Sequence, residues 1–564
     1  MVKTALSTDE KLGKALVDGA FIERQQLDQA LEESKKTGKR LGEILTEQEI
    51  ISSETIATVL SFQLNIPVVD LRQYKVQPEA IQLVPEHIAR EKQVIPLNTD
   101  NGTLRVAMEN PEDLEAIDLL SSLTKMKIRP VLPLHGGVQE LIDTNYKPTA
   151  RLAEDLRATA PVERAPEAPP LLRAEEVSRA PAVQAVDTIL AQAVKERASD
   201  IHITPREDKL DILYRIDGVL RPATSLPLDI HDALISRIKV LSGMDIAERR
   251  RPQDGQFSLQ IGGQNLDFRV ATAESNLGEM MVLRVLDKSS AILDLSKLGF
   301  QTSSLERFQQ MLSLPFGMIL VSGPTGSGKT SSLYAAIYRF VGTGRNIMTV
   351  EDPIEYHIEG INQIQVNRQA GITFASGLRA IMRLDPDIIL VGEIRDTETA
   401  NTAVQAALTG HLVLTTIHAN NSAEAIIRLM NMGVEPYLVA SAVVGSVAQR
   451  LIRQICPYCK VATRSSSEAA LYQNEMGEEW EEFYMGRGCN SCAYTGFLGR
   501  TGVFEVMPIS EAIATMINRG VSRKEIVDQA VSEGMLTMQR DGMLKAKEGI
   551  TLPSEVMRKV FTVG

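Results

Sequence analysis

The chain has 564 residues, more than one hydrophobic core normally serves, because cores stop growing near roughly 250–300 residues. Its 44% hydrophobic and 23% charged residues are typical of a globular protein, and its net charge of -12 argues against a general nucleic-acid binder, which needs a basic surface. No apolar run reaches the roughly 20 residues that span a bilayer. The first residues, MVKTALSTDEKLGK, lack the hydrophobic stretch of a signal peptide. We therefore expect several domains and a cytoplasmic location.

A gapless internal repeat occupies residues 11–63. KLGKALVDGAFIERQQLDQALEES (11–34) aligns with RLGEILTEQEIISSETIATVLSFQ (40–63). Apolar positions three and four apart predict a helix, a turn and a second helix in each copy. A small helical bundle explains the apolar positions but not the basic-Leu-Gly triplet that opens both copies. These triplets are Lys11, Leu12 and Gly13 in the first copy and Arg40, Leu41 and Gly42 in the second.

The next part of the chain predicts two α+β regions joined by a linker. Residues 68–145 contain short β-rich runs between helical stretches, and with the repeat they form a predicted domain over 1–146. Residues 147–182 are rich in Pro, Ala and charge, which predicts a flexible linker. From 183 to about 295, a helix followed by alternating strands predicts a second α+β domain.

After Phe300 the pattern becomes strand, helix, strand. GMILVSG, NIMTVED, DIILVGEI and HLVLTTIH are apolar strand candidates with helical stretches between them. This alternation predicts a parallel sheet covered by helices, so residues 296–564 are predicted to form an α/β domain.

GPTGSGKT fits the phosphate-binding loop G-x-x-x-x-G-K-[S/T] and lies between a predicted strand and a predicted helix. Its glycines allow backbone N–H groups to surround phosphates at a helix N-terminus. Lys329 would reach the β and γ phosphates of ATP, and Thr330 would bind Mg²⁺. The predicted nucleotide-binding set is Gly323, Pro324, Thr325, Gly326, Ser327, Gly328, Lys329, Thr330 and Ser331.

Acidic residues follow two strands that neighbour this loop in sequence order. Glu393 follows the predicted strand DIILV and could bind Mg²⁺ or a water molecule on it. The predicted strand before it in the chain, NIMTVED, leads into carboxylates that could orient the water that attacks ATP. These are Glu351, Asp352 and Glu355. His418 ends another strand and could sense the γ phosphate. The alternatives are solvated loop carboxylates and an ordinary hydrogen-bonding histidine.

All four cysteines form two C-x-x-C pairs, Cys456/Cys459 and Cys489/Cys492. Four thiolates in two close pairs suit tetrahedral Zn²⁺, and a site filled by protein ligands is structural. The separation of the pairs exceeds that of short zinc ribbons, which predicts an inserted helix such as SSEAALYQNEM. The alternative is four unrelated buried thiols.

GPTGSGKT, TVEDPIEY, DPDIILVGEIRDTETA and TGHLVLTTIHAN resemble the Walker A, Asp box, Walker B and His box of the secretion ATPases, the hexameric motors of type II secretion and type IV pili. The resemblance extends from about 185 to the C-terminus. It implies a RecA-like ATPase domain preceded by a smaller, PAS-like α+β domain. It also implies that Glu355 and Glu393 are catalytic.

In this family, arginines of the smaller domain reach the nucleotide of a neighbouring subunit. The candidates are Arg206, Arg215, Arg269 and Arg284. Arg215 and Arg269 are favoured because each sits on a predicted strand, and the alternative is surface ion pairs. The resemblance further implies a homohexamer at the inner face of the cytoplasmic membrane, where it is held by an inner-membrane platform protein. A four-cysteine zinc module implies a motor for assembly and not for retraction. The rival enzyme class is a RecA-like nucleic-acid translocase.

The repeated triplet resembles the tandem N-terminal motif of MshE-type pilus ATPases, which binds cyclic di-GMP. The family motif runs from Arg to Gln. The second copy keeps Arg40 and Gln63, whereas the first has Lys11 and Ser34. Arg40 can offer a planar fork that a lysine cannot copy, Gly42 allows close approach, and Leu41 and Leu45 would pack on the base. The alternative is a degenerate repeat that only docks onto the platform protein.

Overall fold

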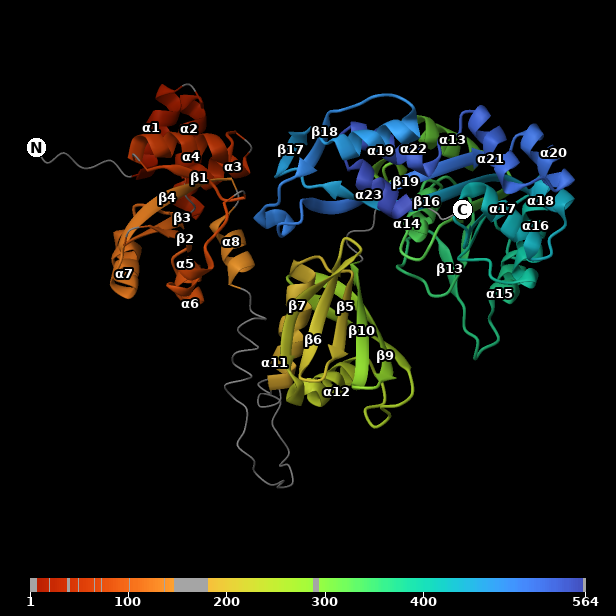
Figure 1. The fold of residues 1–564 in the computed structure, drawn as a ribbon, viewed down its shortest axis with the longest axis horizontal. Helices are drawn as coiled ribbons and strands as arrows, with labels where there is room; N and C mark the ends of the chain where they lie inside the picture. The colour runs from red at the N-terminus through yellow and green to blue at the C-terminus, as the bar shows by residue number, and fades with distance from the viewer. Residues whose placement is uncertain are drawn as a thin grey trace, which may run out of the picture. The chain divides into compact units, whose positions relative to one another are not determined.

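The computed structural model describes residues 8–19, 21–37, 41–48, 50–64, 66–72, 74–100, 102–135, 137–146, 181–287 and 294–560. Two compact units are present (Figure 1). The first comprises Met1–Asp155, Cys456–Lys460 and Gly486–Phe497, and the second comprises the remainder. The linker predicted at 147–182 lies outside the described residues, except for its last two residues, which begin a helix. Among the described residues, no helix combines the length and apolar character needed to cross a bilayer.

The repeat folds as two helical hairpins, which confirms the predicted helix-turn-helix in each copy. The helices are α1 (Thr8–Asp18), α2 (Arg24–Thr37), α3 (Leu41–Glu47) and α4 (Ser53–Leu64). Leucines at equivalent positions of the two copies meet in one core, as Leu12 and Leu41 show. Helix α1 includes Lys11, whereas Arg40 of the second copy lies outside the described residues.

An α+β layer follows within the first unit. Its sheet has the order β1-β4-β3-β2, with β2 and β3 antiparallel and the other pairs parallel. The strands are β1 (Val68–Asp70), β2 (Val94–Asp100), β3 (Thr103–Met108) and β4 (Lys127–His135). The helices are α5 (Pro78–Gln82), α6 (Glu86–Glu91), α7 (Leu114–Thr124) and α8 (Val138–Asn145). Within the same unit, the side-chain amide of Asn490 donates to the carbonyl oxygen of Leu71 at 2.8 Å.

The second unit begins with an antiparallel sheet of order β7-β6-β5-β10-β9-β8. The strands are β5 (Asp200–Pro205), β6 (Lys209–Ile216), β7 (Val219–Pro227), β8 (Gln253–Ile261), β9 (Gln264–Ser275) and β10 (Gly278–Asp287). Helix α11 (Pro181–Lys195) packs on it, with the Tyr214 hydroxyl donating to the Ile189 carbonyl at 2.8 Å. Helix α12 (His231–Leu241) follows β7. Buried and more exposed residues alternate along β6 and β9, which explains why the sequence of this region predicts strands.

The rest of the second unit is built on a seven-stranded sheet of order β13-β12-β14-β15-β11-β16-β19. From β13 to β16 in this order, each strand is parallel to its neighbour, which confirms the predicted parallel sheet. The strands are β11 (Gly317–Ser322), β12 (Ile347–Glu351), β13 (Asn362–Gln365), β14 (Ile388–Val391), β15 (Leu412–Ile417), β16 (Val443–Ile455) and β19 (Phe497–Pro508).

Helices cover both faces of this sheet, because successive residues of each strand point to opposite sides. Met318 and Leu320 of β11 join one core, whereas Ile319 and Val321 join the other. The first core contains residues of α15 (Phe374–Ile381), α16 (Thr397–Leu408), α17 (Ser422–Asn431), α18 (Pro436–Ala442), α20 (Glu511–Arg519) and α21 (Arg523–Ser532). The second contains residues of α13 (Thr302–Leu312) and α14 (Lys329–Tyr338).

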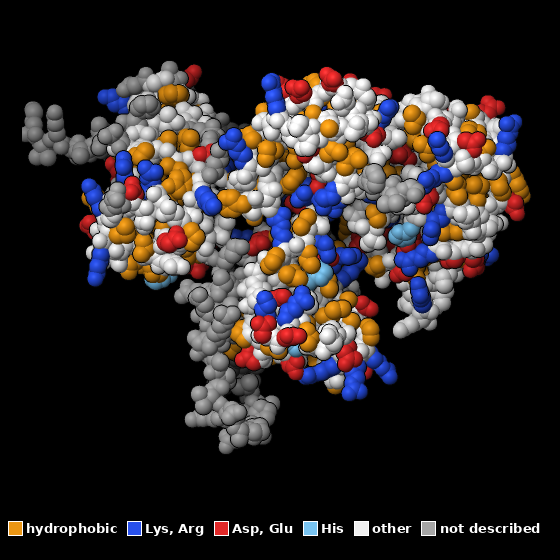
Figure 2. Space-filling view, viewed as in Figure 1, with side chains coloured by type: hydrophobic (Ala, Val, Ile, Leu, Met, Phe, Trp, Pro, Cys, Tyr) orange, Lys and Arg blue, Asp and Glu red, His pale blue; other side chains and the backbone are white. Residues whose placement is uncertain are grey.

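Further elements complete the second unit. They are β17 (Lys460–Thr463), α19 (Ser466–Met476), β18 (Phe483–Gly486), α22 (Met538–Lys547) and α23 (Pro553–Val560). Helix α19 is the helix predicted between the two cysteine pairs. Acidic, basic and apolar side chains are interspersed over the face shown in Figure 2.

Candidate nucleotide site and metal centre

The loop between β11 and α14 has the backbone that the glycine pattern predicts. Gly323, Gly326 and Gly328 have φ values of 152°, 76° and 86°, which favour glycine. A Cβ at Gly323 would also lie 2.5 Å from Ser327 Oγ and 2.6 Å from the Gln449 carbonyl oxygen. The loop therefore combines a positive φ with close packing, and its N–H groups lead into the first turn of α14.

Lys329 is the first residue of α14, and its side chain folds back over the loop. Nζ donates to the carbonyl oxygens of Gly323 at 2.9 Å and Pro324 at 3.0 Å. Burial lowers the pKa of Lys329, Glu393 opposes this effect, and Arg450 adds to it. The neighbouring Thr330 is exposed. An ammonium group thus lies at the loop, and a hydroxyl is free to meet a ligand or Mg²⁺.

Glu393 lies two residues beyond the end of β14, at the carboxyl edge of the sheet. Its carboxylate contacts Arg395, and His418 Nε2 lies 3.4 Å from Glu393 Oε2. The hydrogen bond from Arg395 to Glu393 raises the pKa of Arg395. The structure thus brings together the predicted Glu393 and His418. It adds Arg395, which the sequence reasoning missed although the stretch GEIRD contains it.

Glu355 lies in the loop after β12 and meets an arginine from the antiparallel domain. Arg269 Nη1 is 2.9 Å from Glu355 Oε2, and Arg269 Nη2 donates to the Ile354 carbonyl at 3.2 Å. The backbone N–H of Glu355 also donates to the Tyr334 hydroxyl at 3.3 Å. Both contacts orient the segment that carries Glu355.

Glu351, which was grouped with Glu355 as a candidate acid, takes another role. It is buried at the end of β12, where it contacts the Tyr334 hydroxyl and accepts a hydrogen bond from Thr349 at 2.7 Å. Burial, followed by the charge of Glu351, raises the pKa of Tyr334. The structure therefore makes Glu351 a buried support for the loop.

The other three candidate arginines pair with acids of their own domain. Arg206 lies 3.0 Å from Asp211, whereas Arg215 and Arg284 lie 3.6 Å and 3.1 Å from Asp200. Their geometry matches the surface ion-pair alternative. Within this chain, Arg269 is the candidate that reaches the loop of Glu355.

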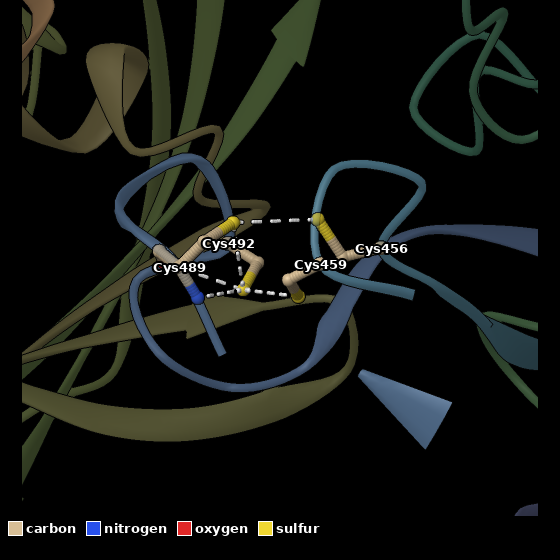
Figure 3. Close-up of side chains that lie close together, drawn as sticks. All are labelled: Cys456, Cys459, Cys489 and Cys492. Carbon is tan, nitrogen blue, oxygen red and sulfur yellow. Dashed lines mark hydrogen bonds between the residues drawn. The ribbon is translucent and has the colours of Figure 1, made fainter. Parts of the chain in front are cut away.

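The four cysteines converge from two loops (Figure 3). All are buried, and their Sγ atoms lie within 4.8 Å of one another. Cys456 Sγ is 3.7 Å from Cys489 Sγ, and Cys459 Sγ is 3.9 Å from Cys492 Sγ. A tetrahedral site with Zn–S bonds of about 2.3 Å would separate its sulfurs by about 3.8 Å. The donor set and spacing therefore fit Zn²⁺.

Comparison with known proteins decides the family. The model described as "Type II/IV secretion system protein" matches residues 175–558, which is more than half of the chain. The chain belongs to the type II/IV secretion system protein family. It is an ATP-hydrolysing enzyme of the pilus-assembly and secretion type, as its relatives are named.

One pilus assembly relative of this secretion ATPase covers it nearly end to end, and a secretion relative covers about three quarters of it. The type IV pilus assembly ATPase PilB of Myxococcus xanthus is 39% identical over 555 residues, covering 97% of this chain and 98% of the relative. Type II secretion system protein E of Klebsiella pneumoniae is 45% identical over 409 residues, covering 72% and 81%. The ATPase DotB of Yersinia pseudotuberculosis has a similar fold, with a TM-score of 0.50 at 20% identity over 66% of this chain and 92% of that one.

A second family model, described as "MshEN domain", matches residues 64–152. This match covers the α+β layer of the first unit and leaves the tandem repeat outside. The presence of an MshE-type domain in this secretion ATPase is therefore shown, whereas ligand binding by the repeat stays a prediction.

The structure places the predicted ligand residues of the repeat unequally. Leu41 is fully buried and Leu12 is 4% exposed in the helical core. The prediction that Leu41 and Leu45 pack on a base is therefore corrected, because the helical core already covers both side chains. Arg40 lies outside the described residues, as do the side chains of Lys11 and Gln63.

The two glycines of the repeat also differ. A Cβ at Gly13 would lie 2.5 Å from Leu27 Cδ1, so packing against α2 explains this glycine. A Cβ at Gly42 would meet Ile56 at 3.5 Å, which is an ordinary contact. Among the described residues, packing therefore explains Gly13 but not Gly42.

Proposed function

We propose that this secretion ATPase is a homohexameric, Mg²⁺-dependent motor that powers assembly of a pilus or pseudopilus. The observation that carries the proposal is the grouping of Lys329, Glu393 and His418 around one phosphate loop, with Arg269 bonded to Glu355. The similarity to a pilus assembly ATPase over 97% of the chain supports a motor that assembles the pilus rather than retracting it.

Each group has a defined task in the proposed reaction. Loop N–H groups and Lys329 hold the triphosphate, and the carboxylate of Glu355 accepts a proton from the attacking water. The water oxygen bonds to the γ phosphorus as the bond to the β–γ bridging oxygen breaks, which yields ADP and phosphate. Glu393 orients the water shell beside Thr330, with His418 near its carboxylate. Mg²⁺, when bound there, neutralises charge on the phosphates.

The reaction is tested by ATP turnover of the purified chain with Lys329→Ala and Glu393→Ala. Loss of at least about 100-fold in kcat is expected from each variant. Glu398→Gln is the matched control, because this exposed acid pairs with Arg379 on the helical surface. Turnover near the wild-type value in either site variant removes the catalytic assignment. Strong stimulation by DNA favours the translocase alternative.

The MshE-type domain supports regulation by cyclic di-GMP through the second copy of the repeat. Arg40 would bind guanine or phosphate through its planar guanidinium, and Gly42 would let the ligand approach α3. Among the described residues, no close neighbour requires a glycine at position 42, which supports this placement. The first unit would then respond to the ligand, while an inner-membrane platform protein holds the motor at the cytoplasmic face of the membrane.

Calorimetry with cyclic di-GMP tests this regulation. Wild type is expected to bind, Arg40→Ala to lose binding, and Lys11→Ala to weaken it less. Lys14→Ala is the control, because Lys14 is an exposed lysine of the same helix as Lys11. If wild type gives no heat, the repeat serves only for docking.

A further inference from the structure

Arg450 is a buried cation beside the phosphate loop. It lies on β16, and the β11–β16 register pairs Ser322 with Ala448, so Arg450 follows at the edge where the loop begins. The residue is only 8% exposed. Its predecessor Gln449 donates from Nε2 to the Ser327 carbonyl of the loop at 2.7 Å. Strand β16 therefore contacts the loop through Gln449 and carries Arg450 as the next residue along the strand.

The guanidinium of Arg450 has weak partners. Nη2 donates to Asn420 Oδ1 at 3.3 Å, and Nη1 donates to the Gln449 carbonyl at 3.5 Å. Among the described residues, no carboxylate oxygen lies within 4.0 Å of it. Arg453, three residues along the same strand, has such a partner, since Nη2 lies 2.8 Å from Glu555 Oε2. Arg450 is thus the arginine of this strand whose charge lacks a close counterion.

The acids at longer range compensate Arg450 incompletely. Glu505 is fully buried and accepts hydrogen bonds from the backbone N–H and hydroxyl of Ser422. Burial raises the pKa of Glu505, which favours its neutral form. Glu424 also acts on Arg450 at a distance, and burial lowers the pKa of the arginine despite both acids.

The positive charge of Arg450 also acts on Lys329. Burial lowers the pKa of the lysine, and the charge of Arg450 lowers it further, so the two cations repel each other. A buried charge without a partner is costly, and a bound anion relieves that cost. Keeping a destabilising group is typical of a binding site.

We propose that Arg450 is a second phosphate-binding cation of this chain's own nucleotide site, acting beside Lys329 on the triphosphate of ATP. This inference rests on ATP binding at the loop, as proposed above. The arginine comes from the same chain as the loop, so it acts without any contribution from a neighbouring subunit. Asn420, which follows His418 by two residues, holds the guanidinium in place.

The test measures two quantities on the full chain, the affinity for Mg²⁺ and AMP-PNP by calorimetry and the melting temperature without nucleotide. Arg450→Gln is expected to weaken affinity at least about tenfold, because hydrogen bonds to charged groups are the strong class. Arg450→Lys, which keeps the charge, is expected to recover most of the loss. The melting temperature of Arg450→Gln without nucleotide should equal or exceed that of wild type.

Arg453→Gln is the matched control on the same strand. It removes an arginine that has its own carboxylate, so it should lower the melting temperature and leave AMP-PNP affinity unchanged. The proposal is overturned if Arg450→Gln binds within about twofold of wild type, or if it lowers the melting temperature as Arg453→Gln does. If wild type itself fails to bind, or Lys329→Ala binds normally, the proposed nucleotide site fails instead.

Discussion

Arg269 and Glu355 form an ion pair that links two domains of the second unit at the candidate site. Both side chains are partly exposed, at 26% and 33%, so the pair should add only about 0–1 kcal/mol to stability. Arg269→Ala is therefore expected to change the melting temperature little and to lower kcat at least about tenfold, because Glu355 loses its orienting partner. Arg206→Ala is the control, since Arg206 pairs within its own domain. Equal turnover in the two variants would show that Arg269 is only a surface partner.

Individual residues were predictable where a local motif carries them. Lys329 and Glu393 follow from spacing next to predicted strands, and the structure gathers them. Arg450 and Gln449 were not predictable in this way, because Gln449 reaches Ser327 from 122 residues away. Arg269 became a candidate through the family resemblance and was favoured with Arg215 because each lies on a predicted strand, whereas its contact with Glu355 depends on how two domains pack.

Glu555 joins helix α23 to strand β16 through an ion pair with Arg453. Its carboxylate accepts a hydrogen bond from Arg453 at 2.8 Å and one from Arg558 at 2.7 Å. Burial alone would raise the pKa of Glu555, but these two arginines outweigh it and hold the pKa below the ordinary 4.5. The stability that this acid contributes is therefore complete above pH 4.5 and is lost as the pH falls through the lower folded pKa.

Glu555→Gln is expected to cost about 1.5–3 kcal/mol at pH 7, because the partly exposed Arg453 and Arg558 lose a charged hydrogen-bond partner. Near pH 3 the difference from wild type should shrink. Melting curves of both proteins at the two pH values measure this change. A destabilisation that is equal at both pH values would contradict the pairing.

Replacing each of the two glycines of the repeat by alanine is expected to change stability in opposite directions. Gly13→Ala is expected to cost about 1–3 kcal/mol, because its Cβ would overlap Leu27 between α1 and α2. Within the part of the chain that the structure describes, Gly42→Ala meets no such barrier and gains from a less flexible unfolded chain, so it should be neutral or stabilising by up to about 1 kcal/mol. Thermal unfolding separates the two, and a larger loss from Gly42→Ala would contradict the packing.

Elements with strong periodicity were predicted well. The hairpins of the repeat, α14 starting at Lys329 and α19 within the cysteine insertion all occur as expected. The strand order β14-β15-β11-β16 was beyond prediction, because neighbours in the sheet come from distant parts of the chain. The burial of Leu41 was missed for the same reason, since its cover comes from other helices of the repeat.

At the scale of the whole molecule, the cysteine centre joins segments 456–460 and 486–497 within the first unit. One Zn²⁺ per chain is expected by elemental mass spectrometry, and Cys459→Ser should lose it. Metal removal should also increase hydrogen exchange in both segments, because the metal–sulfur bonds that join the two loops are then lost. Unchanged exchange after complete chelation would show that the fold of these loops does not depend on the ion.

The central claim is that one phosphate loop and Glu393 together hydrolyse ATP. The most direct test is Glu393→Gln, in which ATP binding and single-turnover hydrolysis are measured on the same sample. The account predicts binding within a few-fold of wild type and a loss of at least about 100-fold in the hydrolysis rate, because the variant keeps Lys329 and the loop but loses the carboxylate. A hydrolysis rate near that of wild type would contradict it.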